Sequence, residues 1–550
     1  MKKYAVGAVA RRMAVGLSLA ALVTGTVALT GGPTPATVSC DASWPMFQHD
    51  PLHSASGCST VGQTTVPTLH PAWFDSTGGS AVTDEPVVSS TTGLGYFGDY
   101  GGTFWAVHSD TGALAWKYSI TTNVTTAAGG SSQSSSACGT DEHSTSYGAF
   151  PGTATVAQVP GVTDPMVFVG GGGTLYAFDG VSGECMWSRN FDPTAPTSSM
   201  EIESSPVYDR QTNDVIVGSD TNVGPANALP GVYAYTAKEG NLDWSYSPST
   251  TVGCDDIWSS PALDSTTQTL VFGTGDCNNP SAVNFPEAVI AIDATTGAQK
   301  WVYAEPPNGY NVPPDTSGGG NYDDDFGMSP IIVQPSEFTA TTCPAPALGL
   351  PPAPNPTLEP DPIVVEGGKT GYVYEFDELT GKLVNAPLQV AQPGNFNVGP
   401  GAIGGFIGSA ALGCAQGKVA VFLTSAVFSP FAQGGIGGAS GEPGGLTTFP
   451  DTTLANDPSR VASVHAFDVS GDKVLWQAPV TTPVFGPATY ANGVVFTPST
   501  TTFSVQALDA DTGTQLWAAP LLAAPSGGVS AVGPAVFFGA GTEFASAGPL

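Results

Sequence analysis

Cysteine is the residue type whose number and spacing say most about chemistry in this sequence. The 550-residue chain contains eight cysteines, and none of them lies in a CxxC or CxxCH arrangement. CxxC pairs are typical of zinc and redox sites, and CxxCH is needed to attach haem c. We therefore expect no zinc finger and no haem, and in an oxidising compartment we expect disulfides. The predicted pairs join neighbours in the sequence: Cys40 with Cys58, Cys138 with Cys185, Cys254 with Cys277, and Cys343 with Cys414.

Carboxylates are the second chemically suggestive group. Asp323, Asp324 and Asp325 stand in a row directly before the segment 326–330, Phe-Gly-Met-Ser-Pro. Such a run fits either an oxygen-rich metal site or a solvated loop. The six histidines are scattered, and no serine or cysteine hydrolase motif stands out. Any active site must therefore be assembled by the fold from distant segments.

A repeated phrase indicates what that fold is. An alternating apolar strand, a turn centred on glycine and a closing aromatic residue first occur together at residues 104–116. The alternation has the period of a β-strand, and the glycine suits the positive φ of a tight hairpin turn. The phrase therefore predicts one hairpin per copy. Six further copies occupy residues 175–187, 232–244, 289–301, 373–385, 464–476 and 505–517.

Two more strand signals precede most copies, so each unit has the four strands of a propeller blade. The C-terminal residues 528–532, 535–539 and 542–545 read as three strands without a closing aromatic strand, and residues 71–74, with Trp73, supply it. Joining the two chain ends in one blade removes a free sheet edge. We predict an all-β, eight-bladed β-propeller, with a seven-bladed ring as the alternative. Ser-rich, Pro-rich and Gly-rich insertions at 121–136, 344–362 and 434–445 are expected to be surface loops.

The N-terminus reads as an export signal. Basic residues between Lys2 and Arg12 precede an apolar stretch that starts at Met13. We expect residues 1–37 to be a signal peptide, 38–70 an N-terminal extension and 71–550 one propeller, which predicts a secreted or periplasmic protein without a membrane span. An uncleaved membrane anchor is the alternative, and the pair Arg11-Arg12 leaves twin-arginine export open beside general secretion.

The charge balance excludes one class of partner. The chain has 14 lysines and arginines against 46 aspartates and glutamates, and its formal net charge is −32. Because nucleic-acid binding relies on neutralising phosphates with basic residues, we expect no nucleic-acid partner.

The repeats carry a family resemblance. The pattern Ala-x-Asp-x-x-Thr-Gly-x-x-x-Trp, matched fully at residues 289–301, resembles the tryptophan-docking repeat of pyrroloquinoline quinone (PQQ) enzymes. WPMFQHD at 44–50, IWSSPA at 257–262 and GGKTGY at 367–372 are similar to segments of polyvinyl-alcohol-dehydrogenase-like members. The repeat also resembles that of a non-catalytic propeller, the outer-membrane assembly lipoprotein of the Bam complex. The resemblance therefore implies the fold more strongly than the chemistry.

The resemblance implies a set of site residues. Lys369 matches a family lysine that holds the quinone, and Trp258 offers it an aromatic face, although packing between blades is the alternative for Trp258. Glu287 stands where relatives usually have an aspartate and is expected to act as catalytic base or ligand. Asp276 stands where they usually have an asparagine that binds calcium, and Asp325 lies in the acidic run that approaches the same site.

Two features depart from the family pattern. The chain has no adjacent Cys-Cys pair, and the family glutamate is not visible in residues 218–230, which contain only Asp220 as an acidic residue. The remaining repeat tryptophans are expected to be structural: Trp116, Trp187, Trp244, Trp301, Trp476 and Trp517.

Two function classes follow. The first is an extracellular PQQ- and calcium-dependent dehydrogenase that oxidises a small or polymeric alcohol and needs an external electron acceptor, because haem is not expected. The second is a quinone-free propeller that binds protein, glycan or cell-wall polymer through its loop face.

Overall fold

The fold was analysed in a computed structural model of the chain. Nearly all secondary structure in the described residues is antiparallel β-sheet, with only two short 3₁₀ turns, η1 (Val66–Thr68) and η3 (Pro335–Phe338). No helix in these residues is long and apolar enough to cross a membrane. The described residues are 17–22 (backbone only), 42–134, 137–139, 149–193, 200–221, 228–250, 256–275, 287–304, 325–338, 343, 361–391, 405–426, 463–469, 471, 473–479, 484–499 and 503–541.

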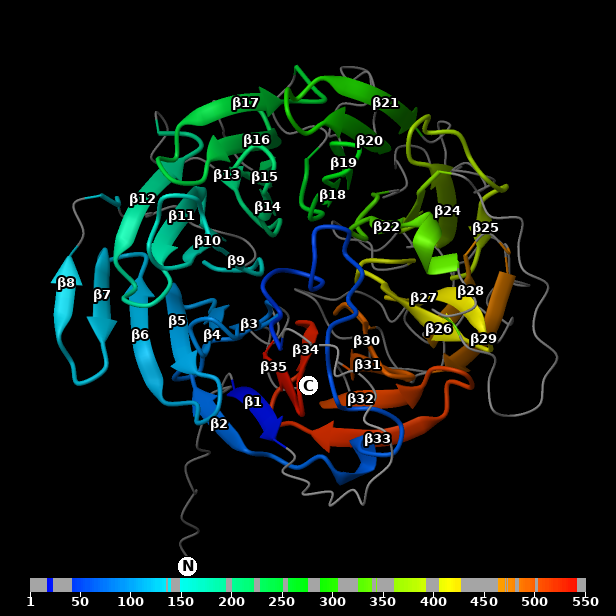
Figure 1. Cartoon of the computed structure of the whole chain (residues 1–550), viewed down its shortest axis with the longest axis horizontal. Coiled ribbons are helices and arrows are strands. Elements are labelled where there is room, and N and C mark those ends of the chain that lie inside the picture. The colour runs from blue at the N-terminus through cyan, green and yellow to red at the C-terminus, as the bar shows by residue number, and fades with distance from the viewer. Residues whose placement is uncertain are drawn as a thin grey trace, which may run out of the picture.

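Eight sheets are arranged as the blades of a wheel, as predicted (Figure 1). In blades one to seven the chain runs outward, from an innermost strand near the axis to the rim. In the first four blades short strands near the axis lead to longer strands at the rim. Their strands are β3 (Val87–Ser89), β4 (Leu94–Gly98), β5 (Thr103–His108) and β6 (Leu114–Ser119); β9 (Thr155–Ala157), β10 (Met166–Gly171), β11 (Thr174–Asp179) and β12 (Cys185–Asn190); β14 (Val207–Asp209), β15 (Asp214–Thr221), β16 (Gly231–Thr236) and β17 (Leu242–Tyr246); β18 (Ala262–Asp264), β19 (Thr269–Gly273), β20 (Ala288–Asp293) and β21 (Gln299–Ala304). A further short strand, β13 (Met200–Glu201), pairs with β15.

Blades five to seven repeat this order. Blade five is the least regular, because its outer strand is reduced to two residues in the copy that lacks a closing tryptophan. Their strands are β22 (Ile331–Val333), β23 (Ile363–Gly367), β24 (Tyr372–Asp377) and β25 (Leu388–Gln389); β26 (Ala411–Ala415), β27 (Lys418–Thr424), β28 (Ser463–Asp468) and β29 (Lys473–Pro479); β30 (Thr489–Ala491), β31 (Val494–Ser499), β32 (Ser504–Asp509) and β33 (Gln515–Pro520).

The eighth blade joins both ends of the chain. Its strand order is β2 (Trp73–Ser76), β1 (Leu17–Leu22), β35 (Ala535–Phe538) and β34 (Val529–Val532), with β34 nearest the axis. The predicted Trp73 strand is confirmed as the outermost strand. The place between β35 and β2 is taken by β1, which falls in the predicted signal peptide, and the predicted strand at 542–545 lies outside the described residues. Cleavage of residues 1–37 stays a prediction.

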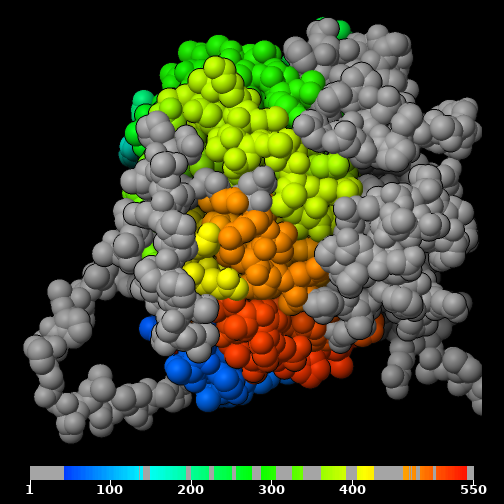
Figure 2. All heavy atoms as spheres, turned by 90° about the vertical axis from the view of Figure 1, so that its right-hand side faces the viewer, coloured from blue at the N-terminus to red at the C-terminus, as the bar shows by residue number. Residues whose placement is uncertain are grey.

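The innermost strands close into a ring. Contacts connect β3, β9, β14, β18, β22, β26, β30 and β34 in this order, and β34 contacts β3 again. Around the rim, successive blades follow one another in chain order, and the N-terminal segment lies beside the last repeat (Figure 2). The predicted eight-bladed ring is therefore the one that the chain adopts, and the seven-bladed alternative is wrong.

The repeat tryptophans lock each blade to the next, which confirms their predicted structural role. The indole Nε1 of Trp116 donates a hydrogen bond to Gly180 O in the following blade (3.0 Å), and Trp73 does the same to Ser109 O (3.1 Å). The turn glycine Gly183 has φ 72°, and a Cβ there would overlap the Trp116 ring. The same bond joins Trp187 to Ala237 O, Trp244 to Ala294 O, Trp301 to Glu378 O, Trp476 to Ala510 O and Trp517 to Leu69 O.

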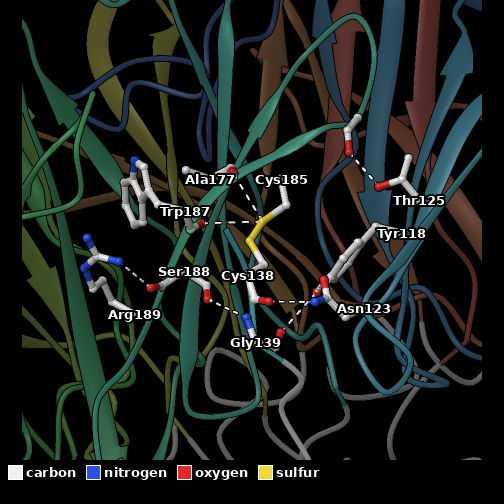
Figure 3. The surroundings of a disulfide bond; sticks show 11 residues. Tyr118, Asn123, Thr125, Cys138, Gly139, Ala177, Cys185, Trp187, Ser188 and Arg189 are labelled. Atoms are coloured by element: carbon white, nitrogen blue, oxygen red, sulfur yellow. Dashed lines mark hydrogen bonds between the residues drawn. A yellow bond between two sulfur atoms is a disulfide. The ribbon is translucent and has the colours of Figure 1, made fainter. Parts of the chain in front are cut away.

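The Ser-rich insertion was expected to be a surface loop, and this is only partly correct. It contains a hairpin, β7 (Val124–Ala127) and β8 (Ser132–Ser134), which extends the sheet of blade one beyond β6. The disulfide between Cys138 and Cys185 then ties the segment to blade two (Figure 3). A second predicted pair, Cys343 with Cys414, is also present, and Cys58 is disulfide-bonded. The other predicted partners, Cys40, Cys254 and Cys277, lie outside the described residues.

Candidate active site at the propeller axis

Three of the predicted site residues come together at one end of the axis. Lys369 follows β23, Asp325 precedes β22 and Trp258 precedes β18, so two neighbouring blades supply all three. Lys369 Nζ lies 2.6 Å from Asp325 Oδ2 and 5.4 Å from the centroid of the Trp258 ring. The backbone N–H of Lys369 also donates to Asp325 O at 2.9 Å. The cation is thus fixed between a carboxylate and an aromatic face.

Two glycines allow this close assembly. A Cβ at Gly275 would lie 2.8 Å from Trp258 Nε1, and a Cβ at Gly327 would overlap the far edge of the same ring. Because these positions have no side chain, the indole can lie against the backbone on either side of it. The orientation of Trp258 is therefore set by backbone contacts, while the residue stays partly exposed.

A cluster of buried acids beside this group was not predicted. Asp220 is the last but one residue of β15, and Asp256 stands two residues before Trp258. Asp256 Oδ1 accepts hydrogen bonds from Thr221 N (3.1 Å) and Thr221 Oγ1 (2.8 Å). The sequence contained one signal for the cluster, since each acid lies at the site end of a strand or just before an innermost strand.

Burial and mutual repulsion raise the pKa of two acids in this cluster. Desolvation raises the pKa of Asp220 well above its usual range, and the charges of Asp256 and Glu203 raise it further. Desolvation also raises the pKa of Asp256, with a contribution from the charge of Asp325. The acids of three blades therefore interact electrostatically. A raised pKa favours the protonated form of Asp220, the form that can donate a hydrogen bond.

Two carboxylate oxygens are available to a ligand. Asp220 Oδ1 and Asp325 Oδ1 are buried and accept no hydrogen bond from the residues that the structure describes. Such oxygens favour a ligand hydroxyl, a cation or a water molecule. Within the described ranges, no three histidine, cysteine or carboxylate side chains converge on a metal position. A lysine, an indole face and two close glycines fit a flat anionic group; a complete calcium site would need further ligands.

Of the other predicted site residues, only Glu287 lies within the described part of the chain. Glu287 lies at the same end of blade four, directly before β20, with a backbone φ of 52°. Its predicted role as base stays a prediction. Asp276, Asp323 and Asp324 lie outside the described residues.

Comparison with known proteins gives a consistent picture. A family model described as outer membrane protein assembly factor BamB matches residues 63–322 and 369–542. The quinohemoprotein alcohol dehydrogenases of Pseudomonas putida HK5 and Comamonas testosteroni superimpose with TM-scores of 0.60 and 0.59, at 16% and 17% sequence identity. The superpositions cover 89% and 92% of this chain, and 74% and 81% of those chains. At these identities the likeness establishes the fold.

One curated relative is detected by sequence. Quinate/shikimate dehydrogenase (quinone) of Acinetobacter baylyi (strain ATCC 33305 / BD413 / ADP1) is 25% identical over 239 residues, which is 38% of this chain. The match spans 26% of that relative, about a quarter of its length.

Proposed function

The chain belongs to the PQQ-type propeller family described by the BamB model, and within this family we propose that it is a quinone-dependent dehydrogenase of alcohols. The observation that carries the proposal is the contact of Lys369 with Asp325 and Trp258 at the axis. A lysine held between a carboxylate and an indole at the axis is an arrangement that could bind a flat anionic cofactor. The quinoprotein relatives support the same assignment.

Each residue has a defined task in this proposal. Lys369 would bind the oxygens of PQQ, and Trp258 would support its ring system. When bound, PQQ would take up the two electrons and two protons that leave an alcohol as it becomes a carbonyl compound. A carboxylate must accept the alcohol proton; Glu287 is one candidate, and Asp325, whose Oδ1 accepts no bond from the described residues, is the second.

The proposal also includes a bound calcium ion and export of the chain from the cytoplasm. Asp325 would contribute one oxygen ligand and Asp276 another, and Ca²⁺ needs several such oxygens. The predicted signal peptide would carry the chain to a secreted or periplasmic location, where its disulfides are stable. Electrons would then pass to an external acceptor.

The test is reconstitution of the purified protein with PQQ, with and without calcium. We expect saturable changes in cofactor absorbance and dye reduction with secondary alcohols. Lys369→Ala should weaken PQQ binding at least tenfold, about 1.4 kcal/mol. Lys238→Ala is the matched control, because Lys238 lies half-exposed in a repeat turn of blade three. Equal affinities of the two variants would remove Lys369 from the site.

The family description favours one other function. An assembly factor acts by binding proteins, so the alternative is a quinone-free propeller that binds protein, glycan or cell-wall polymer through its loop face. The absence of saturable PQQ binding in the experiment above would leave this as the better assignment.

A further inference from the structure

The N-terminal segment 44–60 runs across the middle of the wheel instead of staying at its rim (Figure 1). It contains the WPMFQHD motif, to which the proposed function gives no role. The segment begins beside blade one, where Trp44 and Val88 exchange two backbone hydrogen bonds. It ends at blade eight, where Gly533 N donates to Cys58 O and Thr60 N donates to Gly533 O. The segment therefore bridges the place where the ring closes.

Between these two points the segment contacts the other blades one after another. Carbonyl oxygens of the segment accept hydrogen bonds from the innermost strands, and Met46 packs against Val207 of blade three and Leu263 of blade four. In six blades the donor is the second residue of the innermost strand, so the bonds lie at one level along the axis. The pairs are Val88 N to Trp44 O, Val156 N to Pro45 O, Leu263 N to Pro51 O, Ile332 N to Leu52 O, Leu412 N to Ser54 O and Tyr490 N to Ala55 O.

These contacts satisfy a specific need of the fold. Each innermost strand presents a sheet edge to the axis, with N–H groups that have no partner within the blade. The segment supplies acceptors to these edges in blades one, two and four to seven. It therefore acts as a shared partner for edges that would otherwise need water.

The path is tight, and the segment partly supports itself. Gln48, His49, His53 and Ala55 all have positive φ, between 50° and 74°. Asp50 accepts hydrogen bonds from Leu52 N at 3.0 Å and Ser54 N at 3.2 Å, which shapes the turn. Side chains with positive φ cost free energy, so this conformation needs the blade contacts to persist.

A ring of polar residues separates the segment from the candidate active site. In blades one to five, the backbone N–H of the residue two positions before the innermost strand donates a hydrogen bond to its counterpart in the next blade. Each bond measures 2.9 to 3.1 Å, and its acceptor is a side-chain hydroxyl. The ring members are Glu85, Thr153, Ser205, Ser260, Ser329 and Ser409.

The order along the axis follows from chain direction. Trp258 stands two residues before Ser260, and Leu263, which bonds the segment, stands three residues after it. Asp325, Ser329 and Ile332 have the same order in blade five. With about 3.3 Å per residue of extended chain, the hydrogen bonds from Leu263 and Ile332 to the segment lie roughly 10 Å past the ring, on the side away from the site. The segment reaches back to the ring in blade one, where Gln48 N donates to Glu85 Oε2 at 2.9 Å.

We propose that residues 44–60 form an axial plug that closes one end of the propeller, so that ligands reach the site only from the opposite end. If the protein oxidises a polymer, which rests on the proposed function, the polymer cannot thread through the wheel. Its reacting hydroxyl must enter and leave at the end that carries Trp258 and Lys369.

Hydrogen exchange of the whole protein tests the plug without any cofactor. A Cβ at Gly57 would lie 2.8 Å from the Trp44 ring and 2.9 Å from the His49 ring, so Gly57→Val should dislodge the plug. We expect exchange in peptides with Leu263, Ile332 and Tyr490 to accelerate by about tenfold or more, while the outer strands β12 and β21 stay protected. Gly139→Val is the control, because a Cβ at Gly139 meets nothing within 4 Å.

A thiol probe tests access directly. Ser329 is 4% exposed, and Ser329→Cys places a thiol in the polar ring. We expect this thiol to react with a small reagent at least tenfold faster in the Gly57→Val background than in the otherwise wild-type protein. If Gly57→Val does not fold, Asp50→Ala, which removes the turn acceptor, replaces it. Unchanged exchange and thiol reactivity, or loss of protection in all blades together, would overturn the plug.

Discussion

At the scale of single residues, the molecule places ionisable groups where water is scarce. The side chains of Lys369 and Asp325 are 11% and 6% exposed, so this ion pair is largely shielded from water. The same reasoning applies to Glu85, which sits in the polar ring and accepts a hydrogen bond from Gln48 N of the plug at 2.9 Å. Both cases predict effects that an exposed ion pair would not give.

The Lys369–Asp325 pair should behave as a unit. Removing one partner leaves a buried charge, so Asp325→Asn and Lys369→Met should each destabilise the protein by about 3 kcal/mol. The double variant should lose less free energy of unfolding than the two single variants together, because it leaves no buried charge unpaired. Urea unfolding of all four proteins gives the coupling free energy, and additive losses would contradict the pairing.

Glu85 should make stability depend on pH. Burial raises its pKa from 4.5 to about 8, and the neighbouring Asp84 is likewise shifted upward, mainly by burial. Between pH 4.5 and about 8, the unfolded chain releases the proton of Glu85 and the folded chain keeps it. The free energy of unfolding therefore falls as pH rises through this range. Glu85→Gln should therefore match the wild type near pH 4 and be more stable at pH 8, on the order of 3 kcal/mol. Parallel pH profiles of the urea midpoint would contradict this.

At the scale of elements, stability depends on how one blade's tryptophan meets the next blade's turn. The turn glycine is needed for its positive φ and for the space that the indole occupies. The sequence predicts the first requirement from the turn pattern. The second arises only when two blades are side by side.

A pair of glycine variants separates these two requirements. Gly183 and Gly78 have φ of 72° and 76°, but a Cβ at Gly183 would overlap Trp116, whereas one at Gly78 meets nothing within 4 Å. Gly78→Ala should cost about 1 kcal/mol from the backbone alone. Gly183→Ala should cost about 1–3 kcal/mol more, because the indole must move. Thermal unfolding measures both, and equal losses would mean that the indole contact adds nothing.

At the scale of the whole molecule, segments from both chain ends close the propeller between blade eight and blade one. Trp73 on β2 contacts Phe537 of blade eight and donates to Ser109 O of blade one. The plug and the contact of Trp517 with Leu69 O connect the same region. We therefore expect closure of the wheel to depend on residues 44–76.

Trp73→Ala should open the wheel at one place. Loss of the indole should destabilise the protein by about 3 kcal/mol and raise hydrogen exchange in blades eight and one first. Trp244→Ala, which removes the same bond between blades three and four, is the control and should loosen those blades instead. Identical exchange patterns in the two variants would show that Trp73 has no special part in closure.

The sequence by itself determined the repeated blades and the docking tryptophans, because strand period, turn glycines and aromatic spacing are local patterns repeated seven times. The structure decided between eight blades and seven, because the eighth is assembled from both chain ends. The sequence also predicted Lys369, Asp325 and Trp258 through the family resemblance.

Only the tertiary structure decided how distant acids share one site, since Asp220, Asp256 and Asp325 belong to three blades, and their positions relative to the strands do not say which acids meet. The tertiary structure also revealed the plug. Its hydrogen bonds are made by backbone carbonyl oxygens, which every residue has, so no sequence pattern indicates that six strand edges will face them. Local hydrogen-bonding patterns are written in the residue order, whereas partners across the axis are selected by the ring as a whole.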